Sequence, residues 1–132
     1  MKHLAAIVVF VLALSLVPSV NAQDNRPTIT QQQLLSLQAA TKAPAFTLLD
    51  VRSVEEYQEG HIKGAVNISH STLADNLAQL AKSKDTMVIV YCRSGRRAGI
   101  AEGILRDNGF TNVKHLDGDM KGWLANQLSV VK

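Results

Sequence analysis

The sequence predicts an α/β domain in which helices flank a parallel β-sheet on both faces. Four short apolar runs alternate with segments of helical periodicity, and right-handed crossovers between such runs give parallel strands. One run, Met87–Tyr91, carries no charge and fits a strand that is buried on both sides. The sequence has no internal repeat or low-complexity stretch, and its 132 residues allow one domain of ordinary size.

Residues 1–22 have the layout of a secretory signal peptide. A polar start precedes an apolar run, Leu4–Val17, and small residues then suit cleavage before Gln23. At ~1.5 Å per residue the run makes about 21 Å of helix, which is shorter than a ~30 Å hydrocarbon core, so we favour a signal peptide over a membrane anchor or a core helix. We therefore expect export to the periplasm or, as the second choice, secretion, with no stable membrane association after cleavage.

The mature chain is predicted to begin with a lead-in and a first helix, residues 23–42, followed by the main domain, residues 43–132. In the lead-in, Thr30-x-x-Gln33 is a capping box that opens a helix ending near Ala40.

The main domain changes between strand and helix patterns several times. Ser53-x-x-Glu56 opens a short helix, and Gly60 suits its end. A longer helix is expected from about Arg97 to Asn108. A helix between two strands is indicated by the spacing of Leu73, Leu77 and Leu80. The expected strands are Phe46–Leu49, Ala65–Ile68, Met87–Tyr91 and Val113–Leu116.

Composition and charge exclude several classes of function. The formal net charge of +3 is too small to indicate a nucleic-acid partner. The single cysteine excludes an internal disulfide, a dithiol redox mechanism and a Cys-based zinc site without other ligands. The histidines have no ligand spacing, and the sequence lacks a Walker loop and a Rossmann fingerprint. We therefore expect neither a metal nor a cofactor.

Cys92 directly follows the most buried predicted strand, and ligands of parallel sheets bind at the carboxyl ends of strands. The loop after it leads into a helix, so its backbone amides can form an anion-binding nest, and Gly95 permits the turn. Three arginines lie within five residues of the sulfur, namely Arg93, Arg96 and Arg97. Positive charge and a helix N-terminus both favour the nucleophilic thiolate and would also hold a small oxyanion.

The alternative is an inert structural cysteine, which should lie inside an apolar run rather than at its end. The nucleophile interpretation requires the Cys92 sulfur to reach solvent, with the surrounding amides turned toward it. A lone cysteine is also unusual in an exported protein, where thiols tend to be oxidised.

Several segments together resemble the signatures of the rhodanese family. They are Leu48–Arg52, Glu55–Tyr57, Gly60–Ile68, Val88–Ala98, Leu116–Asp119 and Gly122–Trp123, and they occur in the family's order between about residues 43 and 124. This resemblance implies a small rhodanese-like α/β domain with sulfurtransferase activity. The family's cysteine takes the outer sulfur of a donor such as thiosulfate, becomes a persulfide, and passes the sulfur to cyanide or a thiol.

The resemblance implies that Cys92 is the nucleophile and the persulfide carrier. It assigns substrate binding to the loop residues Arg93, Ser94, Gly95, Arg96 and Arg97. We expect Arg93 and either Arg96 or Arg97 to face inward. Asp50 and Arg52 are expected to support the site through hydrogen bonds and charge pairing. The implied partners are small sulfur donors and acceptors, with a protein thiol open as a further acceptor.

Two other functions remain open on the same scaffold. One is a non-catalytic persulfide carrier or partner-binding module. The other is a cysteine-dependent phosphatase, which would need arginine at the sixth position after the cysteine, where this chain has Ala98. The chain also departs from the family at Ala98, often Ser or Thr, and at Asp119, often Gly, whose charge could weaken anion binding.

Overall fold

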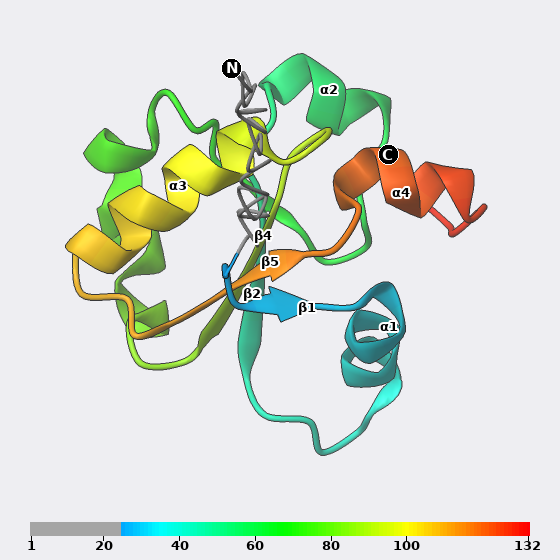
Figure 1. Cartoon of the computed structure of the whole chain (residues 1–132), viewed down its shortest axis with the longest axis horizontal. Coiled ribbons are helices and arrows are strands. Elements are labelled where there is room, and N and C mark those ends of the chain that lie inside the picture. The colour runs from blue at the N-terminus through cyan, green and yellow to red at the C-terminus, as the bar shows by residue number, and fades with distance from the viewer. Residues whose placement is uncertain (1–24) are drawn as a thin grey trace, which may run out of the picture.

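A computed structural model describes residues 25–132, and the signal peptide predicted for residues 1–22 lies outside this part. A five-stranded parallel sheet has the order β1-β5-β4-β2-β3, which confirms the predicted fold class (Figure 1). The strands are β1 (Thr28–Ile29), β2 (Phe46–Asp50), β3 (Val66–Asn67), β4 (Met87–Tyr91) and β5 (Asn112–Leu116).

The helices cover both faces of the sheet, with α3 and η1 on one side and α1 and α4 on the other (Figure 1). They are α1 (Gln31–Ala39), α2 (Val54–Glu59), the 3-10 helix η1 (Leu73–Ser83), α3 (Arg96–Asp107) and α4 (Asp119–Ala125). Both predicted capping boxes form, with Thr30 and Ser53 as the N-caps of α1 and α2. These side-chain oxygens satisfy amides that a helix leaves unpaired in its first turn.

Two elements have no counterpart in the sequence prediction. Strand β1 is two residues long, too short to show any periodicity, and it pairs with the edge of β5. Helix α4 starts after Gly118, whose φ of 81° is left-handed, and no side chain in the described part of the chain caps it. The predicted helix around Leu77 is a 3-10 helix with a kink at Asn76 rather than an α-helix.

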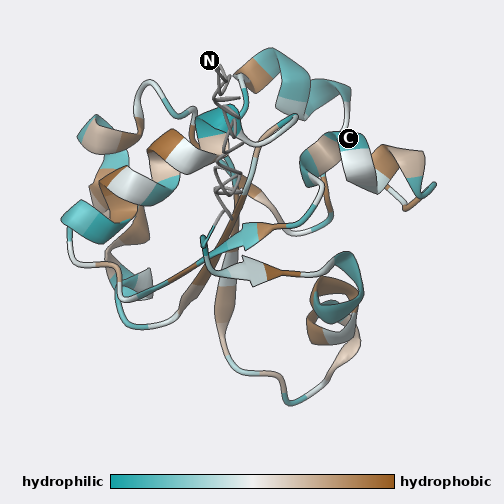
Figure 2. Ribbon diagram, viewed as in Figure 1, coloured by the Kyte–Doolittle hydropathy of each residue, from teal (hydrophilic) through white to brown (hydrophobic). Residues whose placement is uncertain are grey.

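The central strand β4 is buried on both faces, as its uncharged sequence indicated. Val88 and Val90 pack with residues of η1 and α3, whereas Ile89 and Tyr91 pack with residues of α1 and α4. This alternation follows from the two-residue period of a strand. Figure 2 shows apolar residues along the central strand β4 and both polar and apolar residues in the helices that cover the sheet.

The carboxyl ends of β2 and β4 lie side by side, because the two strands pair in register from Phe46–Met87 to Asp50–Tyr91. The amide of Val51 continues this pairing by donating to the carbonyl of Tyr91 over 3.0 Å. The two loops that carry the candidate residues therefore leave the sheet next to each other.

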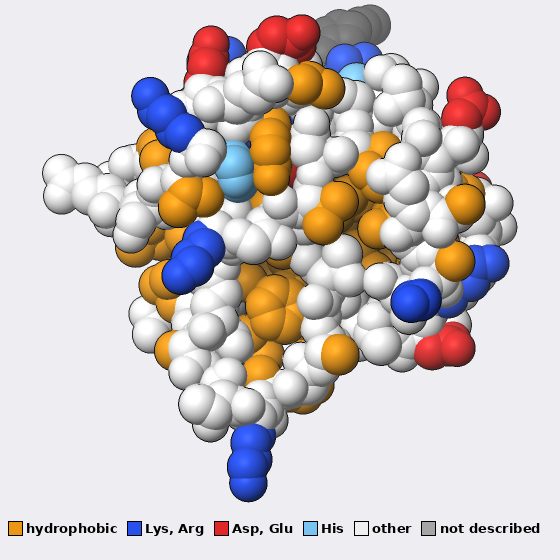
Figure 3. Space-filling view, turned by 180° about the vertical axis from the view of Figure 1, so that it is seen from behind, with side chains coloured by type: hydrophobic (Ala, Val, Ile, Leu, Met, Phe, Trp, Pro, Cys, Tyr) orange, Lys and Arg blue, Asp and Glu red, His pale blue; other side chains and the backbone are white. Residues whose placement is uncertain are grey.

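An apolar hollow on the sheet edge lies away from these loops. It is lined by residues of α1, β2 and β3, among them Leu37, Phe46 and Val66, and none of the predicted site residues lines it. Figure 3 shows apolar side chains gathered in the middle of the face opposite to the one seen in Figure 1.

Candidate active site

The loop after β4 turns back on itself so that a backbone amide meets the cysteine sulfur. The N–H of Gly95 donates to Cys92 Sγ over 3.0 Å. Gly95 has a φ of 116°, and a Cβ atom there would lie 3.2 Å from a carboxylate oxygen of Asp119. Both the backbone angle and the close contact require glycine at this position. Helix α3 begins at the next residue, and its first-turn amides have no intrahelical partners.

Helix α4 holds the same loop from the other side. Asp119 Oδ1 accepts a hydrogen bond of 3.0 Å from the amide of Cys92. The amides of Met120 and Lys121 donate over 3.0 Å each to the carbonyls of Cys92 and Arg93. The helix that sequence patterns missed is therefore the element that fixes the position of the candidate nucleophile.

Behind the loop lies a buried chain of charged groups. His115 Nε2 lies 3.0 Å from Asp119 Oδ2, and His115 Nδ1 lies 2.7 Å from Glu102 Oε2. Burial alone would lower the pKa of His115, but the hydrogen bonds to Asp119 and Glu102 outweigh this effect and raise the pKa to about 9. Sequence reasoning set His115 aside, because its partners come from two different helices and share no motif with it.

The three loop arginines have different environments. Arg97 forms a bidentate ion pair with Glu56, with N–O distances of 2.6 and 3.0 Å. The hydrogen bonds from Arg97 lower the pKa of Glu56 to about 2, and those bonds raise the pKa of Arg97. Arg93 and Arg96 are exposed, and within residues 25–132 neither side chain forms a hydrogen bond or an ion pair. Ser94 is exposed as well.

Glu56 is therefore a site residue that sequence reasoning recognised only in part. Its role in the capping box was predicted, and Oε1 accepts the amide of Ser53 over 3.2 Å. The same oxygen also accepts from Arg97, which lies 41 positions further along the chain. No local pattern signals a contact over that separation.

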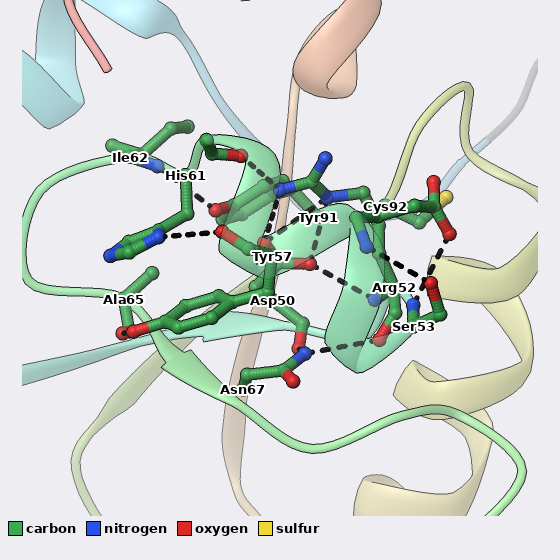
Figure 4. Close-up of polar contacts among 12 residues, drawn as sticks. Asp50, Arg52, Ser53, Tyr57, His61, Ile62, Ala65, Asn67, Tyr91 and Cys92 are labelled. Atoms are coloured by element: carbon green, nitrogen blue, oxygen red, sulfur yellow. Dashed lines mark hydrogen bonds and ion pairs between the residues drawn. The ribbon is translucent and has the colours of Figure 1, made fainter. Parts of the chain in front are cut away.

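Asp50 and Arg52, at the start of the loop after β2, form a buried ion pair (Figure 4). Arg52 Nε and Nη2 donate to the carboxylate of Asp50 over 2.7–3.1 Å, and Nη2 also donates to the carbonyl of Gly60 over 2.8 Å. Burial lowers the pKa of Arg52, but the bonds to Asp50 overcome this effect and leave the pKa raised. The guanidinium also lies 5.7 Å from the centre of the Tyr91 ring. This arrangement fixes the loop after β2 to the end of α2 and places the guanidinium beside Tyr91 at the end of β4.

One requirement of the sequence interpretation is not met: the Cys92 side chain does not reach solvent freely. The residue is only 1% exposed and packs with Val51, Val90 and Ala98. The reason is the direction of the strand, which turns the sulfur toward the face covered by α3. A reagent can reach the sulfur only when neighbouring side chains move aside.

Two surface hollows are lined by residues that belong to the Cys92 loop or contact it. One is lined by residues of the α2 loop, α4 and the C-terminal segment, including Arg52, Glu56, Met120, Leu124 and Val130. The other is lined by Arg26, Ser94, His115, Asp119 and Lys121 among others. Within residues 25–132, no group of three or more His, Cys, Asp or Glu side chains is arranged to hold a metal ion. In the same part of the chain, no helix is long and apolar enough to cross a membrane.

Comparison with known proteins gives consistent matches. The family described as the rhodanese-like domain matches residues 30–126. Thiosulfate sulfurtransferase PspE of Escherichia coli is 36% identical over 88 residues, which cover 64% of this chain and 85% of that protein. Human thiosulfate:glutathione sulfurtransferase is 32% identical over 113 residues, 76% of this chain and 96% of that protein.

Other relatives are longer, and their names differ. The chain spans 43% of the HTH-type transcriptional regulator Rv0324 of Mycobacterium tuberculosis, at 44% identity over 77% of this chain. Among solved structures, the rhodanese-like domain of the Anabaena protein Alr3790 superposes with a TM-score of 0.70 at 30% identity, covering 80% of this chain and 79% of that one.

Proposed function

The chain belongs to the rhodanese-like domain family, and on this premise we propose that it is a thiosulfate sulfurtransferase that works through a persulfide on Cys92. The observation that carries the proposal is the 3.0 Å hydrogen bond from the Gly95 amide to Cys92 Sγ. A backbone N–H that faces the sulfur stabilises negative charge on it without any rearrangement.

The proposed reaction has two steps. In the first, the Cys92 thiolate attacks the outer sulfur of thiosulfate. The sulfur–sulfur bond of the donor breaks, its electron pair leaves with sulfite, and Cys92 keeps the transferred sulfur as a persulfide anion. In the second, cyanide or a thiolate attacks the outer sulfur of the persulfide, and the Cys92 thiolate is regenerated.

The charges around the loop support this assignment. Arg93 and Arg96 have side chains without protein partners in the described part of the chain, so both can pair with the oxygens of the donor. Arg97 is neutralised by Glu56, and its proposed role is to shape the loop rather than to bind the donor. We propose that Asp50 and Arg52 support the site by fixing the neighbouring loop.

The size of the loop favours a sulfur donor over a phosphate ester. Arg97 is the fifth residue after Cys92, so the loop lacks the arginine at the sixth position that a cysteine-dependent phosphatase would need. The deep burial of the sulfur further favours small substrates. Glutathione is an acceptor in the name of the human relative, and we include low-molecular-weight thiols among the acceptors proposed here.

Two further proposals concern the chain as a whole. We propose export directed by residues 1–22, and a mature chain that consists of the lead-in, residues 23–42, and the domain, residues 43–132. The residues of β1 and α1 contribute Ile29 and Leu34 to the same core as β4. Export is tested by expressing the full chain and a chain that begins at Gln23. We expect only the full chain to be recovered outside the cytoplasm, with Gln23 as its first residue.

The activity is tested by thiocyanate formation from thiosulfate and cyanide. We expect turnover by the wild-type protein and none by Cys92→Ser, because serine lacks a sulfur that can form a persulfide. Lys42→Ala, an exposed position outside the site, serves as the matched control and should leave turnover unchanged. Equal turnover in the wild type and Cys92→Ser would rule out the proposed mechanism.

A further inference from the structure

The buried chain of Glu102, His115 and Asp119 touches the Cys92 loop without touching the sulfur. We propose that His115 and Asp119 are positioning residues of the site, in which protonated His115 neutralises Asp119 so that Asp119 can hold the loop without repelling the anionic donor. This inference rests on the proposed sulfurtransferase function and names a group that controls donor binding.

The hydrogen bonds form one continuous path. The Cys92 amide donates to Asp119 Oδ1, and the other oxygen of Asp119 faces His115 Nε2. The second ring nitrogen of His115 faces Glu102 Oε2. All three side chains are buried, so each bond is formed away from competing water.

With Asp119 and Glu102 both ionised, the path requires a protonated imidazole. An ionised carboxylate only accepts hydrogen bonds, and a neutral imidazole has a single N–H. Both nitrogens of His115 face carboxylate oxygens, at 2.7 and 3.0 Å, so both bonds form only when both nitrogens carry a proton. The raised pKa of His115, about 9, agrees with this geometry.

The same groups support the turn whose amide faces the sulfur. A Cβ atom on Gly95 would lie 3.2 Å from Asp119 Oδ2 and 3.8 Å from His115 Nε2. Gly95, whose amide donates to Cys92 Sγ, therefore lies next to the Asp119–His115 pair.

The charges that face His115 come from several elements. Asp119 lies on α4 and Glu102 on α3, and the buried Glu102 Oε1 has no hydrogen-bond partner among residues 25–132. The guanidinium groups of Arg26 and Arg106 each lie 4.0 Å from that oxygen. Charged side chains also line the hollow shared with His115, and these are Arg26, Asp117, Asp119 and Lys121.

Loss of the His115 proton consequently leaves Asp119 as an unneutralised charge under the loop. Thiosulfate is a dianion, so one added negative charge next to the loop that binds it weakens its binding by about tenfold or more. The protonated form predominates below pH 9, and donor binding should weaken as the pH rises through that value.

The test measures the first half-reaction, persulfide formation from thiosulfate alone, because cyanide ionises in the same pH range. The rate at increasing thiosulfate concentration gives the half-saturating concentration and the maximal rate. In the wild type, we expect the half-saturating concentration to rise about tenfold between pH 7.5 and pH 10. His115→Gln should show that rise already at pH 7.5, because glutamine cannot carry the positive charge.

Asp119→Asn provides the conservative variant. Asparagine keeps an oxygen for the Cys92 amide and tolerates the left-handed φ of 53° at this position, but it carries no charge. We expect it to shift the rise to a pH well below 9, because His115 loses one of the two carboxylates that raise its pKa. In combination with His115→Gln, it should restore the half-saturating concentration at pH 7.5 to within about twofold of the wild type. A purely structural role predicts no such rescue.

The proposal is overturned if His115→Gln binds thiosulfate like the wild type at pH 7.5, or if the double variant binds it as weakly as His115→Gln does. Thermal unfolding identifies any variant that fails to fold. If a variant fails, NMR of the His115 imidazole in the wild type tests the proposal instead. The His115 ring should titrate near pH 9, and the Gly95 amide resonance should follow it. If the wild type forms no persulfide, the proposed function fails, whereas a Gly95 amide that ignores the titration overturns this inference.

Discussion

The burial of a protonated His115 predicts an unusual dependence of stability on pH. The pKa of His115 is about 9 in the folded protein, compared with 6.5 for an unperturbed histidine. Because the folded pKa is raised, the stabilisation is fully present below pH 6.5 and is lost as the pH rises through 9. A pKa difference of about 2.5, at ~1.4 kcal/mol per pKa unit, adds roughly 3 kcal/mol to the free energy of unfolding near pH 6. At about pH 10 it adds almost nothing.

The assay is urea unfolding of the wild type and His115→Gln between pH 7 and pH 9.5. The free energy of unfolding of the wild type should exceed that of the variant by an amount that falls by about 2 kcal/mol over this range. The comparison with the variant removes contributions from other titrating groups. A difference that stays constant, or that grows with pH, would refute the assignment of a protonated His115 between two carboxylates.

Three substitutions test other parts of the site. Glu56→Gln should release Arg97 and lower the half-saturating thiosulfate concentration severalfold in steady-state kinetics, and an unchanged or higher value would contradict the neutralising role of Glu56. Gly95→Ala should abolish persulfide formation, as seen by mass spectrometry, whereas Gly64→Ala, which shares a left-handed φ (83°) but has no atom within 4 Å of the added Cβ, should retain it. Arg52→Ala leaves a buried carboxylate unpaired and should lower the free energy of unfolding by about 3–5 kcal/mol in urea titrations. A loss below about 1 kcal/mol would show that the pair does not stabilise the loop after β2.

Much of the fold was predictable because its signals are local. The uncharged strand Met87–Tyr91 and the two capping boxes each fall within a few consecutive residues, and each appears in the structure as expected. Helix α4 was not predictable, since it begins at two left-handed residues, Gly118 and Asp119, and lacks a capping side chain.

The site was predictable only as far as its linear motif extends. The loop around Cys92 could be located from sequence, but the groups that hold it come from distant segments, with Glu56 pairing Arg97 and Asp119 holding the Cys92 amide. The burial of the sulfur was also missed, because the position of a residue at the end of an apolar run does not reveal which face of the sheet its side chain will occupy.

The central claim is that Cys92 carries the transferred sulfur, and intact-mass spectrometry tests it most directly. After treatment with thiosulfate and removal of the excess, the wild-type protein should be heavier by the mass of one sulfur atom, and cyanide should return it to its original mass. Cys92→Ser should show neither change. A wild-type mass that thiosulfate leaves unaltered would contradict the account.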